Sequence, residues 1–279
     1  MLVHAPAKLN LCLYLGPLRE DGLHELCSLF EPLALADLIE VAPAERDEVV
    51  CPGVEGENLA ARALAGLRER GWEREPLRIE IEKRVPVAAG LGGGSGDAAA
   101  VLRLAAGEVA DLPQLAAELG ADVPSQLRPS LALVRGAGER IEPLPEPAEH
   151  AAVLLPGGGG LSTAAVFAEA DRLGLGRSAA ELDQVAGRLR EAAGAAPSPL
   201  AYPELLVNDL TDAALSLRPD IGNALGALRA AGAPVAILSG SGPTAVGLFP
   251  DLAAARDAAA ATGYDEAIVC AAGHARLAP

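Results

Sequence analysis

The stretch Pro86-Val-Ala-Ala-Gly-Leu-Gly-Gly-Gly-Ser-Gly-Asp-Ala-Ala-Ala100 decides how this chain is interpreted, because five of its fifteen residues are glycine. It leads directly into an alanine-rich stretch that is expected to form a helix over 97–109. Glycine lets a backbone approach a ligand closely and adopt positive φ angles. A helix start presents unpaired N–H groups and the positive end of the helix dipole. Together these features predict a phosphate-binding site, and hence a protein that handles a nucleotide.

Two common phosphate-binding patterns do not fit this stretch. A Walker A loop ends in Gly-Lys-Ser/Thr, and residues 86–100 contain no lysine. The loose dinucleotide fingerprint Gly94-x-Gly96-x-x-Ala99 is present, but the expected helix covers most of it. No acidic residue closes a second strand about 20 residues later, as that fold requires. The stretch therefore predicts a phosphate loop of another kind, placed between a strand and a helix.

The overall composition limits the possible partners. The chain has 279 residues, enough for two domains with a substantial buried core. Its formal net charge of −16 argues against a nucleic-acid or anionic-membrane partner, because either would bind a basic surface. A nucleotide remains possible as a substrate, since a local site can be positive within a negative molecule.

The cysteines and the start of the chain predict where the protein works. Cys12, Cys27, Cys51 and Cys270 have no metal-site spacing and have apolar neighbours, so we expect buried thiols in a reducing compartment. The start Met-Leu-Val-His-Ala-Pro lacks a charged-then-apolar signal pattern. No apolar run reaches the roughly 18 residues of a membrane span. We therefore expect a cytoplasmic protein.

Lysine is scarce in this chain, because Lys8 and Lys83 are its two lysines among 22 basic residues. A position that keeps lysine where arginine is otherwise favoured is a candidate for a role that a guanidinium does not serve. Lys83 can also be explained as an ordinary surface residue.

The pattern of apolar residues and breakers predicts an α+β protein with two domains. A proline-rich stretch, Glu142-Pro-Leu-Pro-Glu-Pro147, is expected to separate residues 1–147 from residues 148–279. In the first part we expect strands at 9–15, 34–41, 77–82 and 131–134, a helix at 58–70, the helix at 97–109, and a helix that begins with a capping box of Asp111 and Gln114 and ends at Gly120. In the second part we expect strands at 153–155, 234–238, 245–249 and 267–271 and helices at 162–173, 181–193, 221–230 and 252–261. The second order is typical of a ferredoxin-like α/β sandwich.

The glycine-rich stretch has the form Pro86-x-x-x-Gly-Leu-Gly-Gly-Gly-Ser-x-Asp97-Ala-Ala, which resembles the ATP-binding motif of the GHMP kinase superfamily. Other segments resemble one family within it, the 4-diphosphocytidyl-2-C-methyl-D-erythritol kinases, and occur in family order over nearly the whole chain. These segments are Ala5-Pro-Ala-Lys-Leu-Asn-Leu11, Arg19-Glu-Asp-Gly-Leu-His-Glu-Leu26, Leu119-Gly-Ala-Asp-Val-Pro124, Leu161-Ser-Thr163 and Asn208-Asp-Leu210. A last segment, Ile237-Leu-Ser-Gly-Ser-Gly-Pro-Thr244, resembles the third motif of the GHMP kinase superfamily, and its residues 239–244 form the third motif loop. Each segment alone is weak, whereas the set is specific.

The resemblance implies a fold and an activity. It implies an N-terminal ATP-binding domain of the ribosomal-protein-S5-domain-2-like type over 1–147 and a C-terminal, substrate-binding, ferredoxin-like domain over 148–279. It also implies an ATP- and Mg²⁺-dependent small-molecule kinase. That kinase would phosphorylate the 2-hydroxyl of 4-diphosphocytidyl-2-C-methyl-D-erythritol, a step of the non-mevalonate route to isoprenoid precursors. We expect a cytidine diphosphate-linked alcohol as partner and a chain that is a monomer or a homodimer.

The resemblance further implies which residues react. Asp122 matches the family's catalytic aspartate and would accept the proton of the attacking hydroxyl or orient that hydroxyl. Lys8 matches the catalytic lysine, whose ammonium would stabilise the charge that develops on the reacting oxygens. Asn10 shares the strand face of Lys8, so it would contact a substrate hydroxyl or Asp122.

Three further groups complete the expected substrate site. His24 resembles the histidine that binds the cytosine, and it is expected on a turn. Thr163 would contact the methylerythritol or diphosphate end, or would cap its helix together with Ser162. The third motif loop would close over the phosphates or shape the pocket, through Gly240, Ser241 and Gly242.

The ATP site is expected along the glycine-rich stretch. Asn58 would approach the adenine or cap its helix, and Asp97 would cap the helix after the loop. The hydroxyl of Ser95 would contact a phosphate or Mg²⁺, and no cage of protein ligands for a metal is expected. The expected ATP-binding residues are Pro86, Val87, Ala88, Ala89, Gly90, Leu91, Gly92, Gly93, Gly94, Ser95, Gly96 and Asn58.

The chain departs from the family pattern near the expected base site. Leu23 occupies the position at which the family usually has a tyrosine that stacks on the cytosine. Phe167 occupies the position of another tyrosine that is usual in the family, in the helix after Thr163. Ser125 and Gln126 replace aromatic residues after Val-Pro. Two alternatives therefore remain open: a GHMP kinase for another small alcohol such as homoserine or mevalonate, and a catalytically silent nucleotide-binding homologue.

Overall fold

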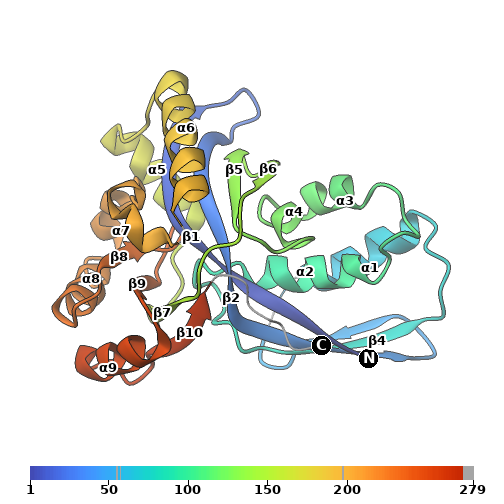
Figure 1. Cartoon of the computed structure of the whole chain (residues 1–279). Coiled ribbons are helices and arrows are strands. Elements are labelled where there is room, and N and C mark those ends of the chain that lie inside the picture. The colour runs from blue at the N-terminus through green and yellow to red at the C-terminus, as the bar shows by residue number, and fades with distance from the viewer. Residues whose placement is uncertain (55, 57, 197, 273–279) are drawn as a thin grey trace.

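The computed structural model describes residues 1–272 except 55, 57 and 197. Two long antiparallel strands, β1 and β2, run through the centre of the molecule and pair along most of their length (Figure 1). β2 also pairs with β4 along one part and with β5 along another, while β3 joins β4 in parallel and β6 joins β5. These strands are β1 (Leu2–Leu18), β2 (His24–Pro43), β3 (Glu48–Val50), β4 (Leu77–Glu82), β5 (Ala132–Gly136) and β6 (Arg140–Pro143).

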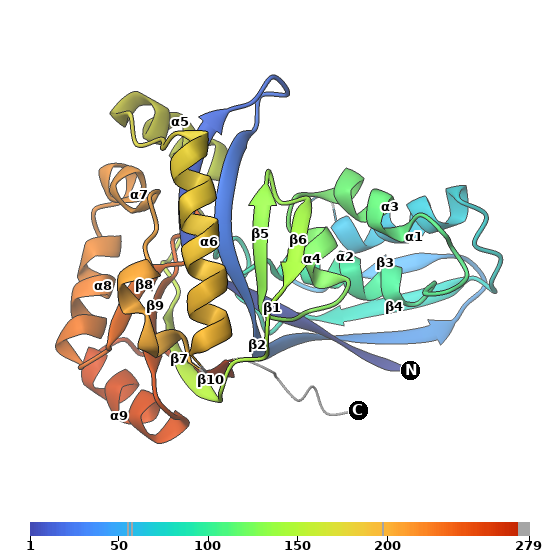
Figure 2. The same cartoon turned by 45° about the horizontal axis from the view of Figure 1, so that its top comes forward.

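Four helices cover one face of the sheet in the first half of the chain (Figure 2). They are α1 (Leu59–Glu69), α2 (Gly93–Arg103), α3 (Leu112–Leu119) and α4 (Val123–Gln126). The buried alanines of α2 pack with Leu64 and Leu67 of α1 and with Ile79 and Ile81 of β4. Because small residues line α2, the helix lies close to β1, and a Cβ on Gly96 would come within 2.9 Å of the carbonyl oxygen of Pro6.

The second half of the chain forms an antiparallel sheet with helices. Its strands lie in the order β10-β7-β9-β8, and its chain order is strand, helices, two strands, helix, strand. This is the ferredoxin-like arrangement, so the expected α+β class is confirmed. The elements are β7 (His150–Leu155), α5 (Thr163–Leu173), α6 (Ala179–Ala195), the 3₁₀ turns η1 (Pro199–Ala201) and η2 (Pro203–Leu205), α7 (Thr211–Leu217), α8 (Ile221–Ala230), β8 (Val235–Leu238), β9 (Ala245–Phe249), α9 (Leu252–Thr262) and β10 (Ile268–Ala272).

The two halves share a core. β10 pairs with β2 at Ala272 and Leu33, and α6 packs on β1 and β2. Leu9 and Leu29 of the first half lie in the same buried cluster as Leu154 and Leu189 of the second. Among the described residues, no helix is both long and apolar enough to cross a bilayer.

Several predicted elements agree with the structure, and the differences have physical causes. The predictions for β4, α8 and β9 are confirmed at both ends. The predicted strands at 9–15 and 34–41 are shorter than β1 and β2, which continue through Pro6 and Pro32. In the structure Pro6 lies at a register shift between β1 and β2, where a proline is tolerated inside a strand.

The helix after the glycine loop and the next helix also differ from expectation. α2 begins at Gly93, four residues before the predicted start, because the glycines themselves form its first turn. It ends at Arg103 rather than at residue 109. The predicted capping box of Asp111 and Gln114 is wrong: Asp111 precedes α3, but its side chain accepts no capping hydrogen bond, because its backbone (φ −102°, ψ 35°) departs from the extended conformation usual for an N-cap. The structure places a capping box at Ser178 and Glu181 instead.

The four cysteines are free thiols. Cys12, Cys27 and Cys270 are buried as expected, and burial raises the pKa of each thiol. Cys51 differs because it is partly exposed.

Candidate active site

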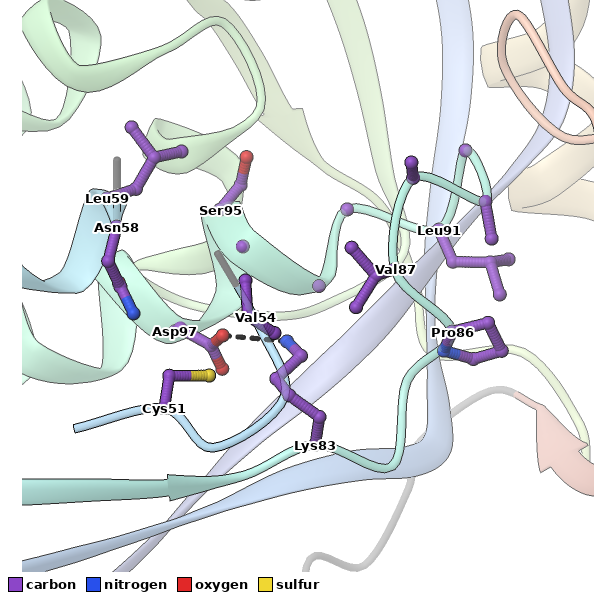
Figure 3. Close-up of a pocket in the computed structure, with 16 residues that line it drawn as sticks. Cys51, Val54, Asn58, Leu59, Lys83, Pro86, Val87, Leu91, Ser95 and Asp97 are labelled. Carbon is purple, nitrogen blue, oxygen red and sulfur yellow. Dashed lines mark hydrogen bonds and ion pairs between the residues drawn. The ribbon is translucent and has the colours of Figure 1, made fainter. Parts of the chain in front are cut away.

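A cavity of about 340 Å³ lies between the start of α1, the end of β4 and the glycine-rich loop (Figure 3). Eleven of the twelve residues expected to bind ATP line it, all except Gly96. Gly96 faces β1 instead, where its missing side chain allows the close contact with Pro6. Asn58 caps α1 as expected, because its Oδ1 accepts a 2.8 Å hydrogen bond from the N–H of Ala60, and it also lines the cavity.

The loop backbone adopts conformations that require glycine at two positions. Gly90 has φ +75° and Gly92, which immediately precedes α2, has φ +68°. A Cβ at Gly92 would lie 2.8 Å from Cγ of Lys8, so the loop and the lysine stem are in direct contact. The N–H groups of the first turn of α2 therefore begin beside Lys8, in the arrangement that favours an anion at a helix start.

A buried ionic cluster forms the floor of this cavity. Nζ of Lys83 lies 2.7 Å from Oδ2 of Asp97 (Figure 3). The same ammonium also contacts Asp37. Asp37 in turn accepts hydrogen bonds from the N–H groups of Arg84 and Val85, immediately before the loop. The cluster therefore fixes the entry of the glycine loop. The surface explanation of Lys83 is wrong, and Asp97 does not cap α2, because it lies within the helix with 3% of its surface exposed.

Burial disfavours the ionised forms of Asp97 and Lys83 in this cluster. Burial raises the pKa of Asp97 to about 7, although Lys83 acts against this shift. Burial opposes the charge on Lys83 as well, but Asp97 and Asp37 outweigh it, so the pKa of Lys83 is raised.

A second cavity, of about 740 Å³, adjoins the first. Lys8, Asn10, His24, Thr163 and Asp122, all predicted from the sequence, line it. Gly240 and Ser241 of the third motif loop also line it, whereas Gly242 does not.

Lys8 and Asp122 meet in this second cavity. Nζ of Lys8 lies 3.1 Å from Oδ2 of Asp122 and 2.6 Å from Oδ1 of Asn10. The same ammonium lies 4.5 Å from the centre of the Phe30 ring. Lys8 is 6% exposed, so its charge is stabilised mainly by these partners and little by bulk water. Asn10 therefore contacts Lys8 rather than Asp122, and its Nδ2 donates to the hydroxyl of Ser28.

His24 and Thr163 lie farther along the cavity wall. Nδ1 of His24 is 3.0 Å from the carbonyl oxygen of Gly16, and Nε2 is 3.1 Å from Oδ1 of Asp171. His24 begins β2 rather than lying on the expected turn. Its ring is 5.6 Å from the ring of Phe167. Leu23 beside it is 52% exposed.

Thr163 faces the third motif loop. Ser162 is the residue that caps α5, through a 3.4 Å hydrogen bond from the N–H of Ala165. The hydroxyl of Thr163 lies 2.9 Å from that of Ser241. Asn208 anchors the backbone of this loop, because its Nδ2 donates hydrogen bonds to the carbonyl oxygens of Leu238 and Gly240.

The two cavities share part of one wall, made of Gly90, Gly92 and Ser95. Lys8 and Asp122 belong to the second cavity, and the glycine loop belongs to both. A phosphate held by the loop can therefore face a group that lies beside Lys8 and Asp122.

The donor set fits Mg²⁺ bound mainly by phosphate. Among the described residues, no group of three or more His, Cys, Asp or Glu side chains could hold a metal ion. Mg²⁺ keeps several waters and commonly takes one or two protein ligands together with substrate phosphates. The hydroxyl of Ser95 on the shared wall suits that role.

Some functional side chains escaped the sequence analysis. Phe30, Ser28 and Asp171 come from positions that carry no local motif. The pairing of β1 with β2 brings Phe30 to the cavity wall and Ser28 behind Asn10, and α5 brings Asp171 to the wall. For the ionic cluster, the one indication in the sequence is that Lys83 is one of two lysines among 22 basic residues.

Comparisons with known proteins agree with this geometry. Residues 58–128 match the family model of the GHMP kinases N terminal domain, and residues 166–264 match that of the GHMP kinases C terminal. The chain is 42% identical to a protein of Kineococcus radiotolerans named 4-diphosphocytidyl-2-C-methyl-D-erythritol kinase, over 90% of this chain and 82% of that one. It is also 42% identical to a protein of the same name from Anaeromyxobacter dehalogenans, over 92% and 83%.

A solved structure supports the same assignment. The chain superposes on a crystal structure of 4-(cytidine 5'-diphospho)-2C-methyl-D-erythritol kinase with a TM-score of 0.80 and 36% identity, covering 98% of this chain and 99% of that one. Both halves of the fold, the two cavities and the sequence similarity thus lead to one assignment. The chain belongs to the GHMP kinase superfamily and, within it, to the 4-diphosphocytidyl-2-C-methyl-D-erythritol kinase family.

Proposed function

We propose that this chain transfers the γ-phosphoryl group of ATP to the 2-hydroxyl of 4-diphosphocytidyl-2-C-methyl-D-erythritol, with Lys8 and Asp122 as the reacting pair. The observation that carries the proposal is the 3.1 Å contact of Nζ of Lys8 with Oδ2 of Asp122, beside the wall that both cavities share. The relatives named above carry the name of this reaction. The smaller cavity takes ATP and the larger one takes the alcohol.

The chemistry follows from the charges at the shared wall. Asp122 accepts the proton of the substrate hydroxyl, and the oxygen then forms a bond to the γ-phosphorus while the bond from that phosphorus to the β–γ bridging oxygen breaks, leaving ADP. Lys8 stabilises the negative charge on the reacting oxygens, and its effect is large because the ammonium is nearly buried. The hydroxyl of Ser95 would help to hold Mg²⁺, which would supply positive charge to the transferred phosphoryl group.

The remaining side chains position the two substrates. The N–H groups at the start of α2 hold the phosphates, and Asn58 lies at the base end of the ATP cavity. His24, oriented by Asp171 and Gly16, binds the cytosine. Thr163 and Ser241 contact the methylerythritol or diphosphate part.

The wider organisation completes the proposal. We assign residues 1–147 to ATP binding and residues 148–279 to substrate binding, in a cytoplasmic monomer or homodimer. Free and largely buried thiols support a reducing compartment. Light scattering on the purified chain distinguishes monomer from dimer.

An alcohol panel tests the function. Purified enzyme with ATP and Mg²⁺ is offered the cytidyl substrate, homoserine or mevalonate, and the phosphorylated product is identified by ³¹P NMR. We expect turnover of the cytidyl compound alone. Turnover of mevalonate or homoserine in its place would refute the substrate assignment, and ATP binding without any product would indicate a silent homologue.

A further inference from the structure

Arg103, the last residue of α2, connects two segments that carry the reacting residues. One terminal nitrogen of its guanidinium donates a 2.7 Å hydrogen bond to the carbonyl oxygen of Gln126, the last residue of α4. The other terminal nitrogen donates a 2.7 Å hydrogen bond to the carbonyl oxygen of His4 on β1. A single side chain thus ties α2, α4 and β1 together.

This arginine lies in an unfavourable place for a charge. No carboxylate among the described residues forms an ion pair with Arg103, and burial lowers the pKa of its guanidinium to about 10. Arg103 is partly buried, and a partly buried cation without a counter-charge costs stability. What an arginine offers in return is a planar fork that reaches two acceptors in fixed directions.

Both acceptors lie one short step from the reacting pair. His4 precedes Lys8 by four residues on the same strand, and Gln126 follows Asp122 by four residues in the turn and helix that Asp122 begins. Ser125 closes that turn by donating a 2.7 Å hydrogen bond to the carbonyl oxygen of Asp122. A shift of either carbonyl would therefore move Lys8 or Asp122.

The other end of α2 carries the phosphate loop. The N–H of Lys8 donates a 2.9 Å hydrogen bond to the carbonyl oxygen of Leu91, and Gly96 packs directly on Pro6. The phosphate loop, Lys8 and Asp122 are therefore all attached to one helix, the loop at its start and the other two through Arg103 at its end.

We propose that Arg103 is a positioning residue for phosphoryl transfer, which sets the separation of Lys8 and Asp122 by holding β1 and α4 at fixed places on α2. The proposal rests on Lys8 and Asp122 being the reacting pair. Arg103 touches no substrate and lines neither cavity. Its loss should slow the chemical step while leaving nucleotide binding nearly unchanged, because a displacement of the order of 1 Å costs about 100-fold in rate.

Steady-state kinetics on two variants test this role. Arg103→Met removes the donors, and Arg103→Lys keeps the charge but has one donor nitrogen. We expect kcat to fall at least ~10-fold in the first and ~3-fold or more in the second, with the ATP Kd within about twofold of wild type. Arg256→Met, at an exposed arginine of α9, is the matched control and should match wild type in both measurements.

A double-mutant cycle separates positioning from general destabilisation. In the Asp122→Asn background, Arg103→Met should cost less than ~3-fold in kcat, because the residue that it helps to position has already lost its function. The same loss in both backgrounds, or kcat within twofold of wild type in both folded variants, would overturn the proposal. If Arg103→Met does not fold, Arg103→Lys alone tests the proposal. A fall in its kcat of ~3-fold or more supports the proposal, and a kcat within twofold of wild type overturns it.

These outcomes are distinct from failure of the proposed function. If Asp122→Asn itself keeps full kcat, the reacting pair is wrong and the role of Arg103 falls with it. If Asp122→Asn is inactive as expected while both Arg103 variants keep full kcat, only the role of Arg103 is refuted.

Discussion

The hydroxyl of Ser239 donates a 3.0 Å hydrogen bond to the carbonyl oxygen of Gly90, which joins the third motif loop to the glycine-rich loop. A Cβ placed on Gly90 would lie 2.5 Å from the carbonyl oxygen of Ser239 and 2.9 Å from that of Gly242. Two backbones thus meet without a side chain between them. The glycine is needed both for this contact and for its φ of +75°.

Substitution of Gly90 should therefore displace the phosphate loop. We expect Gly90→Ala to weaken ATP binding at least ~10-fold by isothermal titration calorimetry, because rigid backbone atoms oppose the added methyl and the left-handed φ penalises alanine. Gly187→Ala is the control, since Gly187 lies exposed within α6 with open space around it. It should bind ATP normally and gain about 0.5–1 kcal/mol of stability. Equal ATP affinity in both variants would refute the loop contact.

Loss of the Asp171 carboxylate should affect the alcohol substrate alone. Asp171 lies 3.1 Å from Nε2 of His24 and lines the larger cavity. We expect Asp171→Asn to raise the KM for the cytidyl substrate ~3–10-fold by loosening the His24 ring, with the KM for ATP unchanged. Asp257→Asn, on an exposed face of α9, should change neither constant. A rise in the KM for ATP, with the KM for the cytidyl substrate unchanged, would contradict the assignment of His24 to the cytosine.

The buried pair of His150 and Glu31 predicts an alkaline loss of stability. Nε2 of His150 lies 3.1 Å from Oε2 of Glu31, joining β7 to β2. Burial alone would lower the pKa of His150, but the hydrogen bond and charge of Glu31 outweigh it and raise that pKa. The folded state then binds more protons than the unfolded state, so this stabilisation is full below the unfolded pKa of about 6.5 and is lost as the pH rises through the folded pKa.

Urea unfolding between pH 6 and 9 measures this effect. The free energy of unfolding should decrease more steeply with pH in the wild type than in His150→Gln, which has no group that titrates there. Parallel pH profiles of the two proteins would contradict a raised pKa for His150.

The sequence predicts the parts of this site that are local. The glycine run, Lys8 and Asp122 each stand in a short motif, and the pattern of apolar residues is enough to predict β4, α8 and β9. The start of α2 was missed because glycine disfavours a helix interior, and its end was placed too late because alanine favours helix on both sides of Arg103. The packing of Gly96 on Pro6 and the hydrogen bond of Arg103 to His4 decide where that helix runs.

Long-range pairings account for the rest. Phe30 reaches Lys8 only because β2 pairs with β1, and Asp171 reaches His24 from a helix far along the chain. The cluster of Lys83, Asp37 and Asp97 joins three segments in the same way. No local sequence pattern predicts such contacts. The scarcity of lysine indicated that Lys83 has a particular role, but it did not indicate that Asp37 and Asp97 are its partners.

The central claim is that Lys8 and Asp122 perform phosphoryl transfer at the wall shared by the two cavities. Coupled ADP-release kinetics with the cytidyl substrate, on wild type, Lys8→Ala and Asp122→Asn, tests it most directly. We predict that each substitution lowers kcat at least ~100-fold while the proteins stay folded and bind ATP. An active wild type whose kcat survives both substitutions would contradict the account.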